Sequence, residues 1–87
     1  MSDIVTVVAA TGEYVGQLVK IDETGIELKR PRMITFEGES MGFARGIAAT
    51  GTVDPESMII LAPIFMTATD DEVAKAWLSA TSGIILQ

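Results

Sequence analysis

The side chains that could do chemistry in this chain are few, because it contains no histidine and no cysteine. It therefore lacks the commonest general base, the thiolate nucleophile and most transition-metal ligands. The densest group of carboxylates is Asp70-Asp71-Glu72, and carboxylates can act as an acid–base pair or bind a hard cation. Helix capping already explains this group, and adjacent residues point to different sides of a helix. We expect no enzyme, no metal site, no cofactor and no small-molecule substrate.

Positive charge is concentrated in one short run. Lys29, Arg30 and Arg32 supply half of the 6 basic residues of the chain. In a strand, Arg30 and Arg32 share one face, where two guanidinium groups could hold RNA phosphates or stack on bases. They could equally pair with acids of a neighbouring subunit or form a solvated charged face.

A further candidate for RNA contact is Arg45, which lies beside Phe43 in the glycine-rich run 37–46. An exposed aromatic ring next to a guanidinium is a common way of holding single-stranded nucleic acid. Phe43 could instead anchor this run to the rest of the domain. The candidate RNA contacts are thus Arg30, Arg32 and Arg45.

Composition limits the partners of the chain. Twelve acidic and six basic residues give a net charge of −6, which excludes a surface evenly coated with phosphate-binding groups but permits a local basic patch. The 87 residues correspond to a single domain spanning 1–87. Hydrophobic residues make up 48% of them, with a mean hydropathy of +0.40, and we expect this excess to be buried between copies of the chain. A monomer with strands rich in Val and Ile is the alternative.

No apolar run approaches the roughly 18–20 residues that cross a bilayer. The longest, from Met58 to Met66, is interrupted by Pro63. The first residues, MSDIVTVV, lack the basic start and the cleavage site of a signal peptide. We expect a cytoplasmic protein without a membrane partner.

Hydrophobic patterning predicts five short strands, at residues 4–9, 14–21, 25–36, 47–53 and 58–67. Pro31 lies in the middle of the third, which favours an edge position or a bulge there. The run 37–46 holds three glycines and is predicted to be a mobile loop. Methionine and phenylalanine side chains are interpreted as filling for a barrel or an interface; they are Met33, Met41, Met58, Met66, Phe36 and Phe65.

The spacing then changes to that of a helix. Val73, Ala76, Trp77 and Ala80 form one apolar stripe, which predicts a helix over about 70–81. A capping box is expected at its start, in which the Thr69 hydroxyl accepts from the amide of Glu72. A short apolar tail follows at 83–87. Five strands and a helix predict a small, strongly bent barrel over about 3–67 with one C-terminal helix.

The second predicted strand, GEYVGQLVKID, carries a recognisable spacing. Gly16, Leu18 and Asp22 follow the pattern glycine, any, leucine, three of any, aspartate. Because glycine has no Cβ, such a strand can bend sharply or let another backbone approach closely. This run resembles the first motif of the Sm-like (LSm) proteins.

Beyond this motif the chain departs from the common Sm pattern. Gly25 and Ile26 stand where the family has a methionine–asparagine pair, whose asparagine is its main base contact. The acidic turn 54–57 occupies the place of the family's arginine–glycine pair. The chain looks closer to Sm-like proteins of tailed phages that infect cyanobacteria, through its runs LKRP (28–31), PESMI (55–59) and ATSGI (80–84).

The resemblance implies an SH3-like, five-stranded antiparallel barrel that assembles into a homo-oligomeric ring of roughly five to seven copies. It implies a phage protein that acts in the infected bacterial cell as an RNA-binding or RNA-modulating ring of altered specificity. The alternative is a structural or adaptor ring that binds protein partners and has no nucleic-acid role.

Overall fold

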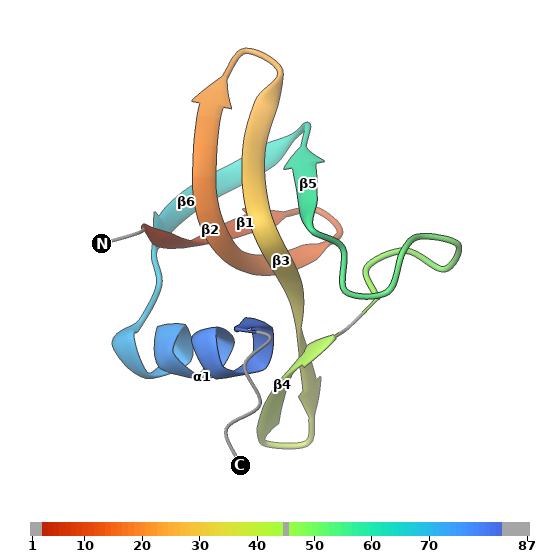
Figure 1. The fold of residues 1–87 in the computed structure, drawn as a ribbon, viewed down its shortest axis with the longest axis vertical. Helices are drawn as coiled ribbons and strands as arrows, with labels where there is room; N and C mark the ends of the chain where they lie inside the picture. The colour runs from red at the N-terminus through yellow and green to blue at the C-terminus, as the bar shows by residue number, and fades with distance from the viewer. Residues whose placement is uncertain (1–2, 45, 83–87) are drawn as a thin grey trace.

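The computed structural model describes residues 3–44 and 46–82, and this part of the chain forms six antiparallel strands and one C-terminal helix (Figure 1). The mainly β class with a terminal helix is therefore confirmed. The sheet is not closed into a barrel, so the closed five-stranded arrangement is wrong for the single chain. The strands are β1 (Ile4–Ala9), β2 (Gly12–Asp22), β3 (Gly25–Glu37), β4 (Ser40–Ala44), β5 (Ser57–Ile60) and β6 (Pro63–Ala68), and the helix is α1 (Asp71–Thr81).

Two of the six strands share one side of β3. The lateral order is β4-β3-β2-β1-β6, and β5 pairs with β3 as well. β5 pairs with the first half of β3, from Ile26 to Lys29, and β4 pairs with its last part, from Met33 to Glu37. Both pairings are antiparallel, so β4 and β5 run in the same direction. β4 and β5 therefore lie one after the other along the same side of β3, separated by the segment that links them.

This interruption accounts for two predicted elements that are wrong, the loop at 37–46 and the strand at 47–53. The expected loop at 37–46 contains β4, because Phe36 and Ile34 of β3 pair directly with Met41 and Phe43. The expected strand at 47–53 does not form, and the described part of this segment makes only one isolated bridge, from Gly46 to Val53.

The expected last strand, 58–67, is divided into β5 and β6. Ile60 ends the pairing of β5 with β3, and Pro63 begins the pairing of β6 with β1. Proline has no amide hydrogen for a ladder bond, so the first position of an edge strand suits it. The chain therefore changes partner strand between residues 60 and 63.

Gly16 lies where β2 passes closest to β3. A methyl group at this position would lie 3.0 Å from the Cβ of Leu28 and 3.2 Å from the carbonyl oxygen of Lys29. The pairing of β2 with β3 shifts register between Val15 and Gln17. The expected close approach of another backbone at Gly16 is confirmed.

Apolar side chains gather in two clusters. The larger consists of Val5, Val7, Tyr14, Ile26, Leu28 and Ile60. The smaller consists of Val15, Ile34 and Trp77, with Ile4, Phe43 and Val73 packed against it. Trp77 and Val73 belong to α1, which lies against the curved sheet in Figure 1. The helix therefore covers the smaller cluster.

The residue that caps the start of the helix differs from the predicted one. Asp70 is the N-cap, and its Oδ2 accepts from the amides of Glu72 at 3.0 Å and Val73 at 3.3 Å. The Thr69 hydroxyl lies 2.9 Å from the hydroxyl of Thr6 in β1, which ties the chain before the helix to the sheet. An Asp side chain accepts from the first-turn amides as well as Thr does, so the cap moves by one residue.

The predicted apolar stripe of the helix is confirmed in part. Trp77 is fully buried and Val73 is half-buried, whereas Ala76 and Ala80 are exposed. Thr81 is buried instead, and its hydroxyl donates to the carbonyl oxygen of Trp77 at 2.9 Å. One large aromatic side chain thus carries most of the contact between helix and sheet.

Replacing Gly16 by alanine tests the close approach of β2 and β3. We expect Gly16→Ala to lower the free energy of unfolding by about 1–3 kcal/mol, because the new methyl group must push the packed Leu28 and its strand away. Urea unfolding followed by circular dichroism, at one fixed protein concentration, measures this loss. Gly46→Ala is the control, because a Cβ there meets no atom within 4 Å. Equal losses for the two variants would contradict the close approach.

Candidate functional site

Two of the three candidate arginines, Arg30 and Arg32, lie where β3 is kinked. Arg30 has a φ of 51°, in the left-handed region that few residues other than glycine adopt. The neighbouring Pro31 is fully buried, and the register shift opposite it marks a β-bulge. The expected bulge at Pro31 is therefore confirmed. The amide of Arg30 donates to the carbonyl oxygen of Glu56 at 2.7 Å, which fixes the segment before β5 to this kink.

The side chain of Arg30 is held by the helix. Its guanidinium lies over the ring of Trp77, with Cζ 5.6 Å from the ring centroid. Its Nη2 donates to Oε1 of Gln17 at 3.3 Å. In return, the indole N–H of Trp77 donates to the carbonyl oxygen of Arg30 at 2.9 Å. The Nε of Arg30 is buried and has no acceptor in the described part of the chain. Arg30 therefore connects the sheet to the helix through both its backbone and its side chain.

Arg32 lies in a different environment from Arg30, and only 7% of its surface is exposed. Its Nη1 donates to the carbonyl oxygen of Pro31 at 2.7 Å, and its Nη2 lies 3.6 Å from Oδ1 of Asp54. Asp54 has a positive φ of 53°. Because a buried guanidinium needs such partners, this ion pair holds the linking segment against β3.

The structure does not bring the predicted RNA contacts together on one open face. Arg30 faces the helix and Arg32 faces Asp54. Arg45 lies outside the described residues. Its neighbour Phe43 is half-buried and packs against the cluster of Val15, Ile34 and Trp77, as the anchoring alternative expects.

The three residues of the Sm-like motif have structural roles. Gly16 permits the close approach described above, and Leu18 packs half-buried against the larger cluster. Asp22 closes the turn between β2 and β3, where its Oδ1 accepts from the amide of Thr24 at 2.8 Å and also from the Thr24 hydroxyl. The hydroxyl bond is the main cause that lowers the pKa of Asp22 from 3.8, with a smaller effect of the nearby Lys20 ammonium.

Within the acidic group at the start of the helix, Asp70 caps the helix in place of the expected Thr69. Asp71 and Glu72 are exposed in the first turn, and Glu72 lies 3.7 Å from the ammonium of Lys75. Across residues 3–44 and 46–82, no cluster of three or more Asp, Glu, His or Cys side chains could hold a metal ion.

The most unusual feature of the described surface is its apolar content. Large apolar side chains are exposed on β2, β3, β4, β5, β6 and α1 and on the segments that link them; they are Val19, Ile21, Phe36, Met41, Val53, Ile59, Leu61, Ile64, Phe65 and Leu78. Four of them follow one another closely at the corner between β5 and β6. We call Ile59, Leu61, Ile64 and Phe65 the apolar corner. Exposed apolar residues that lie close together are candidates for contact with another protein.

The methionines and phenylalanines divide between core and surface. Met33, Met58 and Met66 are half-buried against the larger cluster, which agrees with their interpretation as filling. Phe36 is 69% exposed and Phe65 is 55% exposed, so neither fills the core of the single chain. The sequence gives no signal for this difference, because strand periodicity does not show which sheet face lacks a cover.

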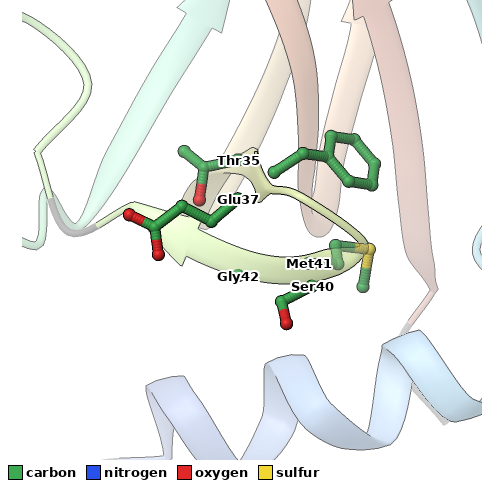
Figure 2. A pocket seen from close by; sticks show the side chains of 6 residues that line it. Thr35, Glu37, Ser40, Met41 and Gly42 are labelled. Carbon is green, nitrogen blue, oxygen red and sulfur yellow. The ribbon is translucent and has the colours of Figure 1, made fainter.

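Shallow hollows lie on the part of the surface that the structure describes. One of about 340 Å³ lies on the β3–β4 hairpin, and Figure 2 shows its lining, which includes Thr35, Glu37 and Met41. A second, of about 270 Å³, lies between the sheet and the start of α1. A third, of about 310 Å³, lies between the β1–β2 turn and β5, and its lining is mostly apolar.

Comparisons of the chain with protein-family models, curated proteins and solved structures find no match. Within the described residues, no helix has the length and apolar character needed to cross a bilayer.

Replacing Trp77 by phenylalanine tests the junction between helix and sheet. A phenyl ring replaces the larger indole, so some buried volume is lost and the carbonyl of Arg30 loses its donor, and we expect a loss of about 1–3 kcal/mol in the free energy of unfolding. Urea unfolding followed by circular dichroism is suitable, because Trp77 is the only tryptophan of the chain. Leu78→Phe, on the exposed side of the same helix, is the control. An unchanged stability of Trp77→Phe would contradict the role given to this bond.

Proposed function

We propose that this chain is an Sm-like subunit that assembles into a homo-oligomeric ring and serves as an adaptor for protein partners. The observation that carries this proposal is the apolar corner, where Ile59, Leu61, Ile64 and Phe65 are each at least half exposed. Such a surface is unfavourable in water for an isolated chain, and a second copy can cover it.

Each of the two strands of the corner has one edge that is unpaired within residues 3–44 and 46–82. β5 pairs with β3, and β6 pairs with β1, at opposite sides of the sheet order. An unpaired strand edge is a template for another strand. If β6 of one copy adds to β5 of the next, each copy uses two different edges, and a contact of this kind closes into a ring when the rotation between copies allows it.

The resemblance to Sm-like proteins supports this assembly. The resemblance implies a strongly bent five-stranded barrel whose copies join into a ring by edge-strand pairing. The features of this chain that support such pairing are Gly16 in the curved β2, Asp22 at the β2–β3 turn, and the edges of β5 and β6 that are unpaired in the described part of the chain. The number of copies in the ring follows the resemblance, roughly five to seven.

The placement of the arginines favours protein partners over RNA. The guanidinium of Arg30 is engaged by Trp77 and Gln17, and that of Arg32 is buried against Asp54. Acids outnumber bases by 12 to 6, so phosphate binding has little electrostatic support. RNA binding through Arg30, Arg32 and Arg45 stays a prediction.

Light scattering on a sizing column tests the ring. We expect a mass of several copies of the 9.2 kDa chain, and a shift to smaller species for Phe65→Lys, because a charge at the apolar corner cannot be buried cheaply. Leu78→Lys is the matched control, because Leu78 and Phe65 are both 55% exposed. A wild-type monomer at micromolar concentration, or an equal effect of both variants, would contradict the ring through β5 and β6.

Titration with short, labelled single-stranded RNAs at several salt concentrations distinguishes the two functions. The adaptor proposal expects no affinity that depends on salt. The RNA hypothesis expects binding that weakens as salt rises, and weakens further in Arg45→Gln. Fluorescence polarisation measures both, and a salt-dependent affinity lost in Arg45→Gln would overturn the adaptor proposal.

A further inference from the structure

We propose that the β3–β4 hairpin and the start of α1 form a docking groove for a peptide segment of another protein, one that carries apolar side chains flanked by Lys or Arg. This inference rests on the adaptor function proposed above and names the chemistry of the partner. We call the surface the hairpin groove. Its apolar residues are Ile34, Phe36, Met41 and Val73, and its acids are Glu13, Glu37 and Asp70.

The groove is made of two hollows that meet at one residue. Met41 lines both the hollow of about 340 Å³ on the hairpin and the hollow of about 270 Å³ beside the start of α1. Figure 2 shows the hairpin above the helix, with Met41 near its tip and the side chains of Thr35 and Glu37 directed to the other side of the hairpin. A partner segment that lies across Met41 would therefore contact both hollows.

The apolar face of the hairpin extends beyond the residues that pack under α1. Ile34 and Phe43 form a cross-strand pair that packs in the cluster covered by α1. The next pair on the same face is Phe36 and Met41, which are 69% and 42% exposed. Residues two apart in a strand share a face. The face that the helix buries at the root of the hairpin is thus open at the tip.

The charge around this face selects the partner. Glu13 and Asp70 line the hollow beside the start of α1, and Glu37 lines the hollow on the hairpin from the opposite face of β3 to Phe36. None of the described lining residues is Lys or Arg. Glu39 adds a further acid in the turn between β3 and β4. An apolar surface bordered by acids attracts an apolar segment bordered by bases and repels an acidic one. A second copy of this acidic chain is disfavoured by the same charges.

The groove is separate from the proposed ring contact. Phe36 and Met41 lie on β3 and β4, whereas the apolar corner lies on and between β5 and β6. Pairing of β5 with β6 of a neighbour therefore does not use this pair of side chains. Each copy in a ring would offer one groove, and several weak sites on one assembly bind a repeated partner more tightly than one site does.

Binding of a designed peptide tests this inference. The probe is a fluorescein-labelled amphipathic helix of leucine and lysine, about 14 residues long, titrated with the full chain at several salt concentrations. We expect binding that weakens as salt rises. Phe36→Ser should weaken it about tenfold, since it removes the apolar anchor. Ile21→Ser, a 55% exposed residue at the far end of β2, should change the affinity less than twofold.

A matched pair of charge variants tests whether the acids act locally. Glu13→Gln with Glu37→Gln should weaken binding about threefold or more, whereas Glu23→Gln with Glu27→Gln, at the β2–β3 end of the sheet, should have less effect. An acidic peptide of leucine and glutamate should not bind. The inference is overturned by absence of binding, by equal loss in both charge variants, or by an unchanged affinity of Phe36→Ser.

Light scattering on the same samples separates this inference from the ring. If Phe36→Ser reduces the oligomer mass, the hairpin face is a contact between copies and the groove is overturned. A ring that does not bind the basic peptide overturns the groove alone. A monomer that binds the peptide through Phe36 overturns the ring and leaves the groove standing.

Discussion

The structure depends on the junction between Trp77 and Arg30. The backbone of Arg30 adopts a left-handed φ of 51°, which its neighbours must hold in place. Trp77 does so from 47 residues further along the chain, by donating to the Arg30 carbonyl and stacking under its guanidinium. The kink divides β3 into one part that pairs with β5 and another that pairs with β4. Both surfaces proposed to bind partners therefore take their orientation from this junction.

The sequence predicts the features that depend on local chemistry. Gly16 and Pro31 mark the close approach and the bulge, because each residue type permits or forbids particular backbone geometry. The spacing of Val73 and Trp77 predicts the helix. The division of 58–67 and the pairing of β4 are not predicted, because they depend on which strand each segment meets. The strand propensity of Ile60 or Phe43 does not indicate which strand its segment pairs with.

The same limit applies to the candidate site. Three basic residues within four positions of a strand suggest a phosphate-binding face, but local sequence does not show what packs against them. Arg32 is buried because Asp54 returns to it from 22 positions away, and Arg30 is covered because the helix docks there. Guanidinium groups suit such places, since they remain charged and donate in several directions. Basic runs next to a proline bulge are therefore weak signals of nucleic-acid binding.

The exposed apolar side chains follow from the open sheet. A small domain buries a limited share of its surface, and a bent sheet that does not close leaves one face of its edge strands without a cover. The apolar corner and the tip of the β3–β4 hairpin are two such places, at different ends of β3. Acids line both hollows of the hairpin groove, and one acid, Glu27, is the cross-strand partner of Ile59 at the corner. An apolar face bordered by several acids suits a basic partner better than a second copy of the same acidic chain. The corner instead offers two strands, β5 and β6, that each have an edge unpaired in the described part of the chain, and such an edge suits a second copy. Strand edges therefore direct assembly, and charge directs recognition, within a single small domain.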